Sequence, residues 1–335
     1  MLSYRHAFHA GNHADILKHS VLVNIFESLN QKEKPYTVFD THAGSGIYNL
    51  EDERALKTNE ANDGILSLLR KMDNIDFPES LSNYYKITDL YKRHKEYPGS
   101  VEFEKIFTNP AGAHLVFELN NSEIDILREN ARKEPRILLH GDSPRVKKES
   151  ILEQGDSPHV KNEANLKQWD SPHAIKTQVF LKDGLSGVIS MSPPKIKRGI
   201  VLIDPSYEEK NDYKLAEEAV SRINKKWNVG IIALWYPLLA HRSIEIEAMK
   251  NSIIANVKAQ NANTDIMDAR LLVNKPDSHT ETSLKENAGP PRLYGSGMLV
   301  INFPWKLDEK TKDNFSYITN AIYKNGCPSY EVNVY

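Results

Sequence analysis

Cysteine is almost absent from this chain, which has a single one, Cys327, among 335 residues. One cysteine cannot form an intrachain disulfide, so we expect the protein to fold in a reducing compartment. Long apolar runs are missing too, because the longest, at residues 229–240, is too short to cross a bilayer and contains Pro237. The N-terminus lacks the apolar core of a secretory signal. We therefore predict a cytoplasmic protein with no membrane partner.

An excess of charge of either sign is also lacking, since 43 basic and 45 acidic side chains give a net charge of −2. This balance neither demands nor excludes a nucleic-acid partner, because phosphate binding needs only a local basic face. Residues 91–95, 195–198 and 224–227 are candidates for such a face, although each is more often a solvated surface. Nothing in the composition indicates an obligate protein partner.

The chain does have apolar runs that alternate with segments of helical periodicity. Strands are predicted at residues 36–40, 113–120, 199–204, 229–236, 265–273 and 296–303. Helices are predicted at 14–30, twice within 62–96, after a cap at Ser122, and at 211–227, 241–257 and 308–324. Such alternation favours an α/β fold with a doubly wound sheet of parallel strands.

Two segments interrupt this alternation. The helices of residues 52–100 predict an inserted helical subdomain, which leaves residues 1–51 and 101–335 for the main domain. Residues 137–178 consist of three 14-residue copies that share Asp-Ser-Pro. This period is short for a solenoid unit, so we predict a tandem expansion on the surface of the main domain.

Side chains suited to a nucleoside follow three of the predicted strand ends. The segment 38–46 carries glycines that let backbone N–H groups approach a ligand closely. Glu118 ends the next strand, where an acid accepts hydrogen bonds from ribose hydroxyls. Asp183 follows an apolar pair in "FLKDG", where an acid can accept an adenine amino group. The sequence therefore predicts a nucleoside site at one edge of the sheet.

A fourth strand runs into "DPSY", residues 204–207. An adenine amine is a poor nucleophile, because its lone pair is delocalised into the ring. A carboxylate and a carbonyl fixed by proline can accept its two N–H bonds, and an aromatic ring can stack on the base. Asp204, the Pro205 carbonyl and Tyr207 fit these roles, and alignment of the reactants supplies much of the rate. The plain alternative is a strand end followed by a turn.

The whole chain resembles the RlmJ family, bacterial methyltransferases that modify an adenine N6 in 23S ribosomal RNA with S-adenosylmethionine. The resemblance runs from "MLSYRHAFHAGNHADILKH" through "DTHAGSG", "YPGS", "FELN", "LKDG", "IDPSY" and "ALWYP" to "SGMLVINFPW". It implies a class I S-adenosylmethionine-dependent methyltransferase fold with a helical insertion, and naked or partly assembled 23S ribosomal RNA as partner. It implies catalytic roles for Asp204, Pro205 and Tyr207. It implies cofactor contacts by Lys18, His19, His42, Gly44, Ser100, Glu118, Asp183 and Gly184.

Two features depart from the family pattern. The quartet is usually Asp-Pro-Pro-Tyr, whereas this chain has Ser206 in third place. The tandem repeat stands just before "LKDG", so Asp142 is an alternative to Asp183 at the cofactor adenine, with Asp183 preferred. A DNA adenine or protein amide methyltransferase stays open, as does a catalytically weak RNA- or cofactor-binding module.

Several aromatic and histidine positions have two readings. The spacing of four N-terminal histidines is compatible with a metal site: His6, His9, His13 and His19. No metal site is predicted, because Gly11 weakens a continuous helix and no cysteine lies nearby. Trp235, with its neighbours, borders either the base pocket or the core. The tyrosines of residues 84–95 stack on RNA or pack inward, and inward packing is favoured.

Overall fold

An eight-stranded sheet forms the centre of the protein, which we describe from a computed structural model over residues 6–139, 174–274, 293–322 and 329–335. The strand order is β10-β8-β9-β7-β6-β1-β4-β5. The strands are β1 (Thr37–Asp40), β4 (Ala113–Glu118), β5 (Thr177–Leu181), β6 (Gly199–Ile203), β7 (Ile231–Leu239), β8 (Ile266–Leu272), β9 (Leu293–Ile301) and β10 (Ser329–Val334).

Five neighbouring strands of the sheet, from β5 to β7, are parallel. The predicted parallel sheet is thus correct for this part. It is wrong for the other edge, because β9 runs antiparallel between β7 and β8, and β10 pairs antiparallel with β8. The carboxyl ends of the five parallel strands meet at one edge, where ligands of open α/β sheets bind.

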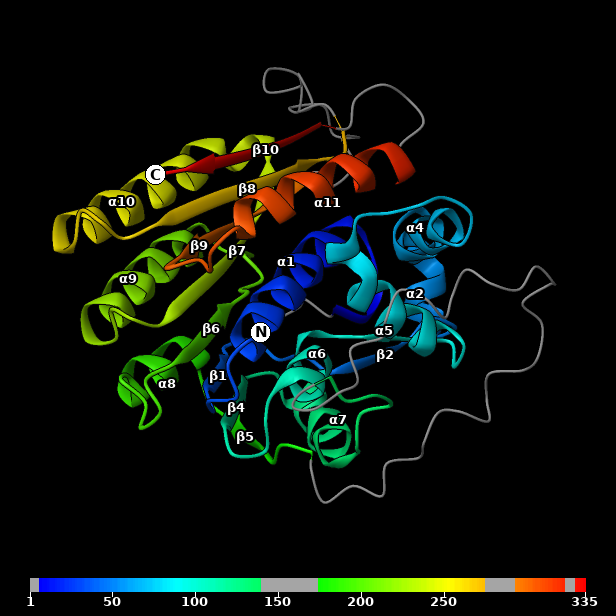
Figure 1. Cartoon of the computed structure of the whole chain (residues 1–335), viewed down its shortest axis with the longest axis horizontal. Helices are drawn as coiled ribbons and strands as arrows, with labels where there is room; N and C mark the ends of the chain where they lie inside the picture. The colour runs from blue at the N-terminus through cyan, green and yellow to red at the C-terminus, as the bar shows by residue number, and fades with distance from the viewer. Residues whose placement is uncertain (1–5, 140–173, 275–292, 323–328) are drawn as a thin grey trace.

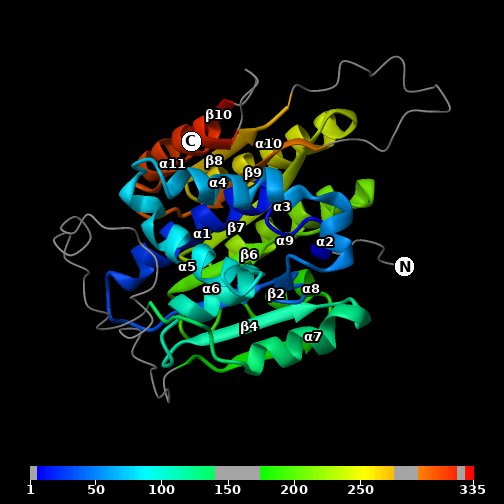
Figure 2. The ribbon, with the colours of Figure 1, turned by 90° about the vertical axis from the view of Figure 1, so that its right-hand side faces the viewer.

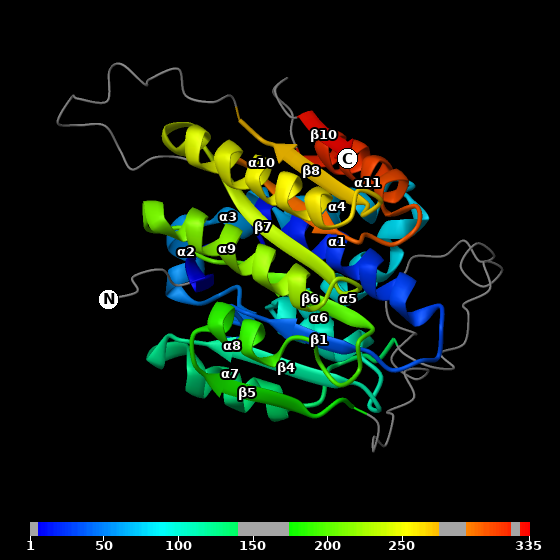
Figure 3. The same cartoon turned by 90° about the vertical axis from the view of Figure 1, so that its left-hand side faces the viewer.

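Helices cover both faces of the sheet (Figures 1 and 3). One face carries α8 (Gly184–Met191), α9 (Lys210–Lys226) and α10 (Ser243–Gln260), which pack apolar side chains on β6 and β7. The other carries α1 (His13–Asn30), α6 (Ser100–Phe107) and α11 (Leu307–Ile322). Helix α7 (Asn121–Arg132) packs against β4 and β5. Strands β1 and β6 are therefore buried on both faces, which explains their uninterrupted apolar runs.

Residues 47–98 form an insertion whose two ends lie side by side. There β2 (Ile47–Asn49) pairs antiparallel with β3 (Glu96–Pro98). Between them lie α2 (Glu53–Thr58), α3 (Glu60–Asp63), α4 (Ile65–Met72) and α5 (Ser82–Lys92), next to α1 in Figure 2. Tyr84 and Tyr91 are fully buried, so the favoured inward packing is confirmed for these two, whereas Tyr85 is half-buried and donates its hydroxyl to Asp73. That residues 52–100 form a separate subdomain stays a prediction.

Two local expectations were wrong. The cap of α7 is Asn120, whose side chain accepts the Ser122 N–H, rather than Ser122 itself. Strand β7 continues through Pro237, because β7 has only β9 as a neighbour there and one missing N–H is tolerated. At residues 91–95 the exposed side chains of Arg93 and Lys95 pair with Asp89 and Glu51, which agrees with the solvated surface that was favoured there.

No helix within the described part of the chain combines the length and the apolar content that a bilayer span requires. Most of the tandem repeat, including Asp142, lies outside the described residues.

Candidate active site

A cavity of about 1710 Å³ opens at the carboxyl ends of the five parallel strands. Its wall combines residues from the N-terminal segment, the insertion and each of these strand ends. Pockets for one small molecule usually measure roughly 300–1,000 Å³. The cavity therefore has room for two ligands side by side.

A glycine turn after β1 forms one wall of the cavity. Gly44 and Gly46 have φ values of +57° and +80°, and a Cβ on Gly44 would lie 2.2 Å from the Tyr48 hydroxyl. Only glycine fits this turn without strain. The Gly44 N–H donates to Glu118 at 2.8 Å, and the same carboxylate accepts the Asn120 N–H at 2.7 Å. The turn and the acid of β4 are thus brought together as predicted from the sequence.

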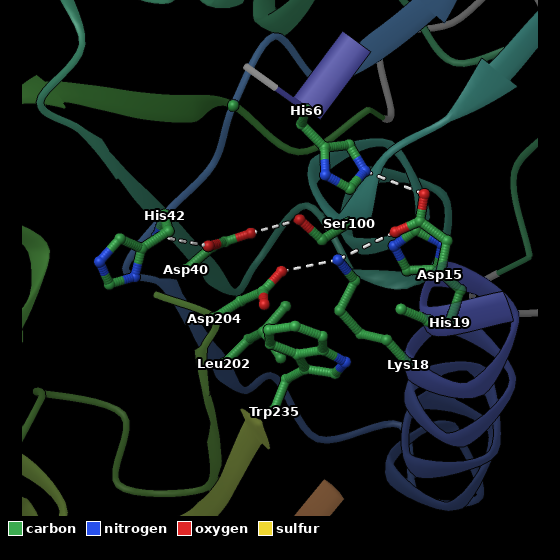
Figure 4. A network of polar contacts seen from close by, with 12 residues as sticks. His6, Asp15, Lys18, His19, Asp40, His42, Ser100, Leu202, Asp204 and Trp235 are labelled. Carbon is green, nitrogen blue, oxygen red and sulfur yellow. Dashed lines mark hydrogen bonds and ion pairs between the residues drawn. The ribbon is translucent and has the colours of Figure 1, made fainter. Parts of the chain in front are cut away.

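Asp40, a residue that the sequence reading passed over, organises the start of this turn. Its carboxylate accepts the His42 N–H at 2.9 Å and the Ser100 hydroxyl at 2.5 Å (Figure 4). It thereby joins two residues that were expected to contact a cofactor. Burial lowers the pKa of His42, which favours a neutral ring there. An acid directly before a glycine turn was the signal that could have identified Asp40.

The β5 side of the cavity holds Asp183 and Gly184. Asp183 caps α8 by accepting the Ser186 N–H at 2.7 Å, and its side chain stays exposed at the cavity. A Cβ on Gly184 would lie 2.0 Å from the Thr41 carbonyl oxygen, so glycine lets α8 begin against the β1 turn. The three predicted nucleoside-binding strand ends therefore converge on one side of the cavity.

Asp204 follows β6, between the ends of β7 and β1, and it is paired with Lys18. The Lys18 ammonium is 2.6 Å from Asp204 and 3.1 Å from Asp15, which in turn contacts His6 at 2.9 Å (Figure 4). Burial alone would raise the pKa of Asp15, but His6 and Lys18 outweigh it and hold that pKa well below its usual range. Asp204 thus faces the cavity as a carboxylate in a charged network.

Lys18 therefore contacts the carboxylate of Asp204. The cofactor contact that the resemblance implied for Lys18 stays a prediction. Helix α1 positions it, because Asn12 caps that helix by accepting the N–H groups of Ala14 and Asp15. His19, one residue on, is fully buried at the inner wall, with its Nδ1 2.8 Å from the Tyr97 hydroxyl. A cofactor contact by His19 stays a prediction.

Pro205 and Ser206 line the cavity beside Asp204, but Tyr207 does not. The Tyr207 ring is 4% exposed, packs 4.6 Å from the Tyr213 ring and donates its hydroxyl to the Trp235 carbonyl at 2.9 Å. In this structure the core contacts both the ring and the hydroxyl of Tyr207, and its stacking on a base stays a prediction. Its φ of +51° is rare for a tyrosine and directs the ring inward.

Comparisons with known proteins agree with this geometry. The family described as "Ribosomal RNA large subunit methyltransferase D, RlmJ" matches residues 33–155 and 140–333. Two relatives are named ribosomal RNA large subunit methyltransferase J. The one from Escherichia coli K12 is 31% identical and covers 97% of this chain and 96% of its own. The one from Haemophilus influenzae is 31% identical and covers 99% and 98%.

The fold also matches a solved structure. A crystal structure of a Legionella pneumophila protein aligns with a TM-score of 0.69 at 24% identity, over 97% of this chain and 98% of that one. With the observed sheet, these matches confirm the predicted class I methyltransferase fold. The chain belongs to the RlmJ family of ribosomal RNA large subunit methyltransferases.

Proposed function

We propose that this protein transfers a methyl group from S-adenosylmethionine to N6 of an adenine in 23S ribosomal RNA. Membership of the family supports the methyltransferase activity, and the names of both relatives support ribosomal RNA as the substrate. The observation that carries the proposal is the position of Asp204. It lies between the strand ends that suit a nucleoside and the rest of a large cavity.

The residues present fit S-adenosylmethionine. The Gly44 turn leaves space that a Cβ would fill, and Glu118 lies directly beside it. We assign the ribose hydroxyls to Glu118 and the adenine amino group to Asp183, with His42, Ser100 and Gly184 around them. When bound, S-adenosylmethionine supplies an electrophilic methyl group on a positively charged sulfur.

Asp204 and Pro205 then hold the substrate amine. The Asp204 carboxylate accepts one N6–H bond and the Pro205 carbonyl accepts the other, which directs the nitrogen lone pair at the methyl carbon. The new N–C bond forms as the C–S bond breaks, leaving S-adenosylhomocysteine. The nitrogen becomes positively charged and releases to solvent the proton that is hydrogen-bonded to Asp204. The Lys18 ammonium, 2.6 Å from Asp204, holds this side chain in place at the cavity.

The target base must leave its stack to reach Asp204, because a paired adenine cannot enter a strand-end cavity. We infer that naked or partly assembled RNA in the cytoplasm is the substrate. The test is transfer of tritium from labelled S-adenosylmethionine to deproteinised 23S RNA from cells that lack the gene. We expect label in N6-methyladenosine of this RNA alone. Label in DNA or protein controls, with none in RNA, would contradict the proposal.

A further inference from the structure

The strand β7 projects beyond its neighbour β6. Its last pair with β6 joins Ile203 to Leu234, yet β7 continues to Leu239 against β9 alone. The side chains of the projecting end alternate as in any strand. Trp235, Pro237 and Leu239 line the cavity, whereas Tyr236 and Leu238 are buried on the opposite face. The projecting end therefore presents an apolar wall directly beside Asp204.

The strand order shows on which side of Asp204 this apolar wall lies. The strand ends that suit a nucleoside belong to β1, β4 and β5, all on one side of β6. The projecting end of β7 lies on the other side of β6. Asp204 ends β6 and stands between the two halves, so a base on the β7 side has its amine within reach of the carboxylate. The apolar wall therefore lies on the side of Asp204 opposite to the proposed binding site of the methyl donor.

Besides five histidines, two large aromatic rings line the described part of the cavity. Among the described residues that line the cavity, Trp235 and Tyr48 carry the indole and phenol rings. Tyr48 lies at the glycine turn, where its hydroxyl accepts the Ser45 N–H at 3.2 Å. Trp235 is half-buried and follows Leu234, the residue paired with the one before Asp204. Figure 4 shows its ring next to the Asp204 side chain.

We infer that Trp235 stacks on the target adenine and that Tyr207 positions it, which rests on the proposed function. The Tyr207 hydroxyl holds the Trp235 carbonyl at 2.9 Å, so the turn after β6 is tied to the projecting end of β7. A flat apolar ring favours a base of either purine type, while Asp204 and Pro205 select the amine.

The test compares Trp235→Phe, Trp235→Leu and Trp235→Ala in steady-state methyl transfer to deproteinised 23S RNA, with S-adenosylmethionine affinity measured by calorimetry. Loss of stacking is expected to raise the KM for RNA about ten-fold in the Leu and Ala variants, with Phe close to wild type. The affinity for S-adenosylmethionine is expected to stay within about two-fold in all three, because the donor half is untouched.

Trp305→Ala is the matched control. Trp305 is 85% exposed and follows β9, whose end at Ile301 pairs with Ile232 at the far end of β7. The KM of the Trp305→Ala variant for RNA is expected to match that of the wild type. A wild-type KM in Trp235→Leu would overturn the inference, and so would weakened S-adenosylmethionine binding in Trp235→Phe. If Trp235→Ala fails to fold, the Phe and Leu pair decides. A wild-type enzyme that does not methylate RNA overturns the proposed function itself.

Discussion

Single carboxylates determine what this cavity can bind, and their chemistry differs with their partners. Asp204 is paired with the ammonium of Lys18, Glu118 accepts two backbone N–H groups, and Asp40 is buried against the Ser100 hydroxyl. The sequence indicated Asp204 and Glu118, because each follows an apolar run. It gave no sign that Lys18 would reach Asp204, since 186 positions separate them and only the tertiary fold brings them together.

Glu118→Ala is expected to weaken S-adenosylmethionine binding about ten-fold or more, because hydrogen bonds from ribose hydroxyls to a carboxylate contribute roughly 1.5–3 kcal/mol each. Glu118 also supports the Gly44 turn. Glu118→Gln keeps an acceptor for that N–H and is expected to lose less. Isothermal titration of both variants measures this. An unchanged affinity in Glu118→Ala would remove the ribose role from this strand end.

Glu104 gives the protein a dependence of stability on pH. Its carboxyl is fully buried, 2.8 Å from His114, and burial raises its pKa to about 8 although its bond with Asp40 and the charge of Lys18 oppose the shift. Burial also lowers the pKa of His114 to about 3, so that ring supplies no charge. The folded protein thus keeps a proton that the unfolded chain releases near pH 4.5.

The stabilisation from this proton is complete below about pH 4.5 and declines until about pH 8, by up to about 1.4 kcal/mol per pH unit. Glu104→Gln mimics the protonated carboxyl and is expected to lose this decline, so its stability relative to wild type rises from pH 5 to pH 8. Urea unfolding at several pH values measures the difference. Parallel curves for the two proteins would show that Glu104 does not titrate in this range.

At the scale of elements, a buried lysine holds α6 and α7 together next to the insertion. Lys105 on α6 donates to the Asn130 and Lys133 carbonyls at the end of α7 and pairs with Glu102 at 2.9 Å. Glu102 also accepts the Tyr91 hydroxyl from α5. The unpaired carbonyls that every helix end leaves are satisfied here by an ammonium, which also suits the negative end of the helix.

Lys105→Met is therefore expected to destabilise the fold by about 3–5 kcal/mol, because the Glu102 charge stays buried without its cation. Lys312→Met is the matched control, since its surface pair with Asp308 at 3.8 Å contributes less than about 1 kcal/mol. Chemical denaturation of both variants gives the comparison. Equal losses would mean that the buried network adds nothing beyond a surface ion pair.

The elements also show what periodicity alone can predict. The ends of α1 and β6 follow from apolar spacing and from strand-ending residues, and the sequence placed both within a residue or two. It placed only the end of β5, at "FLKDG", because this strand is short and half-exposed, and it missed β10, which is mostly exposed and has no apolar run. Aromatic identity at Tyr207 is readable from a sequence, whereas the φ that turns the ring inward is a tertiary outcome.

At the scale of the whole molecule, the tandem repeat offers a test of how far the catalytic fold depends on it. The described chain ends at residue 139 and resumes at residue 174, before β5. Removing residues 144–171 deletes two copies in phase and keeps both flanks. Loop length changes the free energy of folding by only about 0.6 kcal/mol per doubling, so methyl transfer is expected to stay near wild type. Lost cofactor binding would instead assign the deleted part of the repeat to the site.

The central claim is that the fold places Asp204 where an adenine amine meets the methyl donor. The most direct measurement is single-turnover methyl transfer to 23S RNA by Asp204→Ala, with S-adenosylmethionine affinity measured on the same preparation. We predict an unchanged affinity and a nearly complete loss of transfer, with Asp204→Asn losing less because its amide oxygen still accepts one N–H bond. Wild-type transfer by Asp204→Ala would contradict the account and leave "DPSY" as a strand end and a turn.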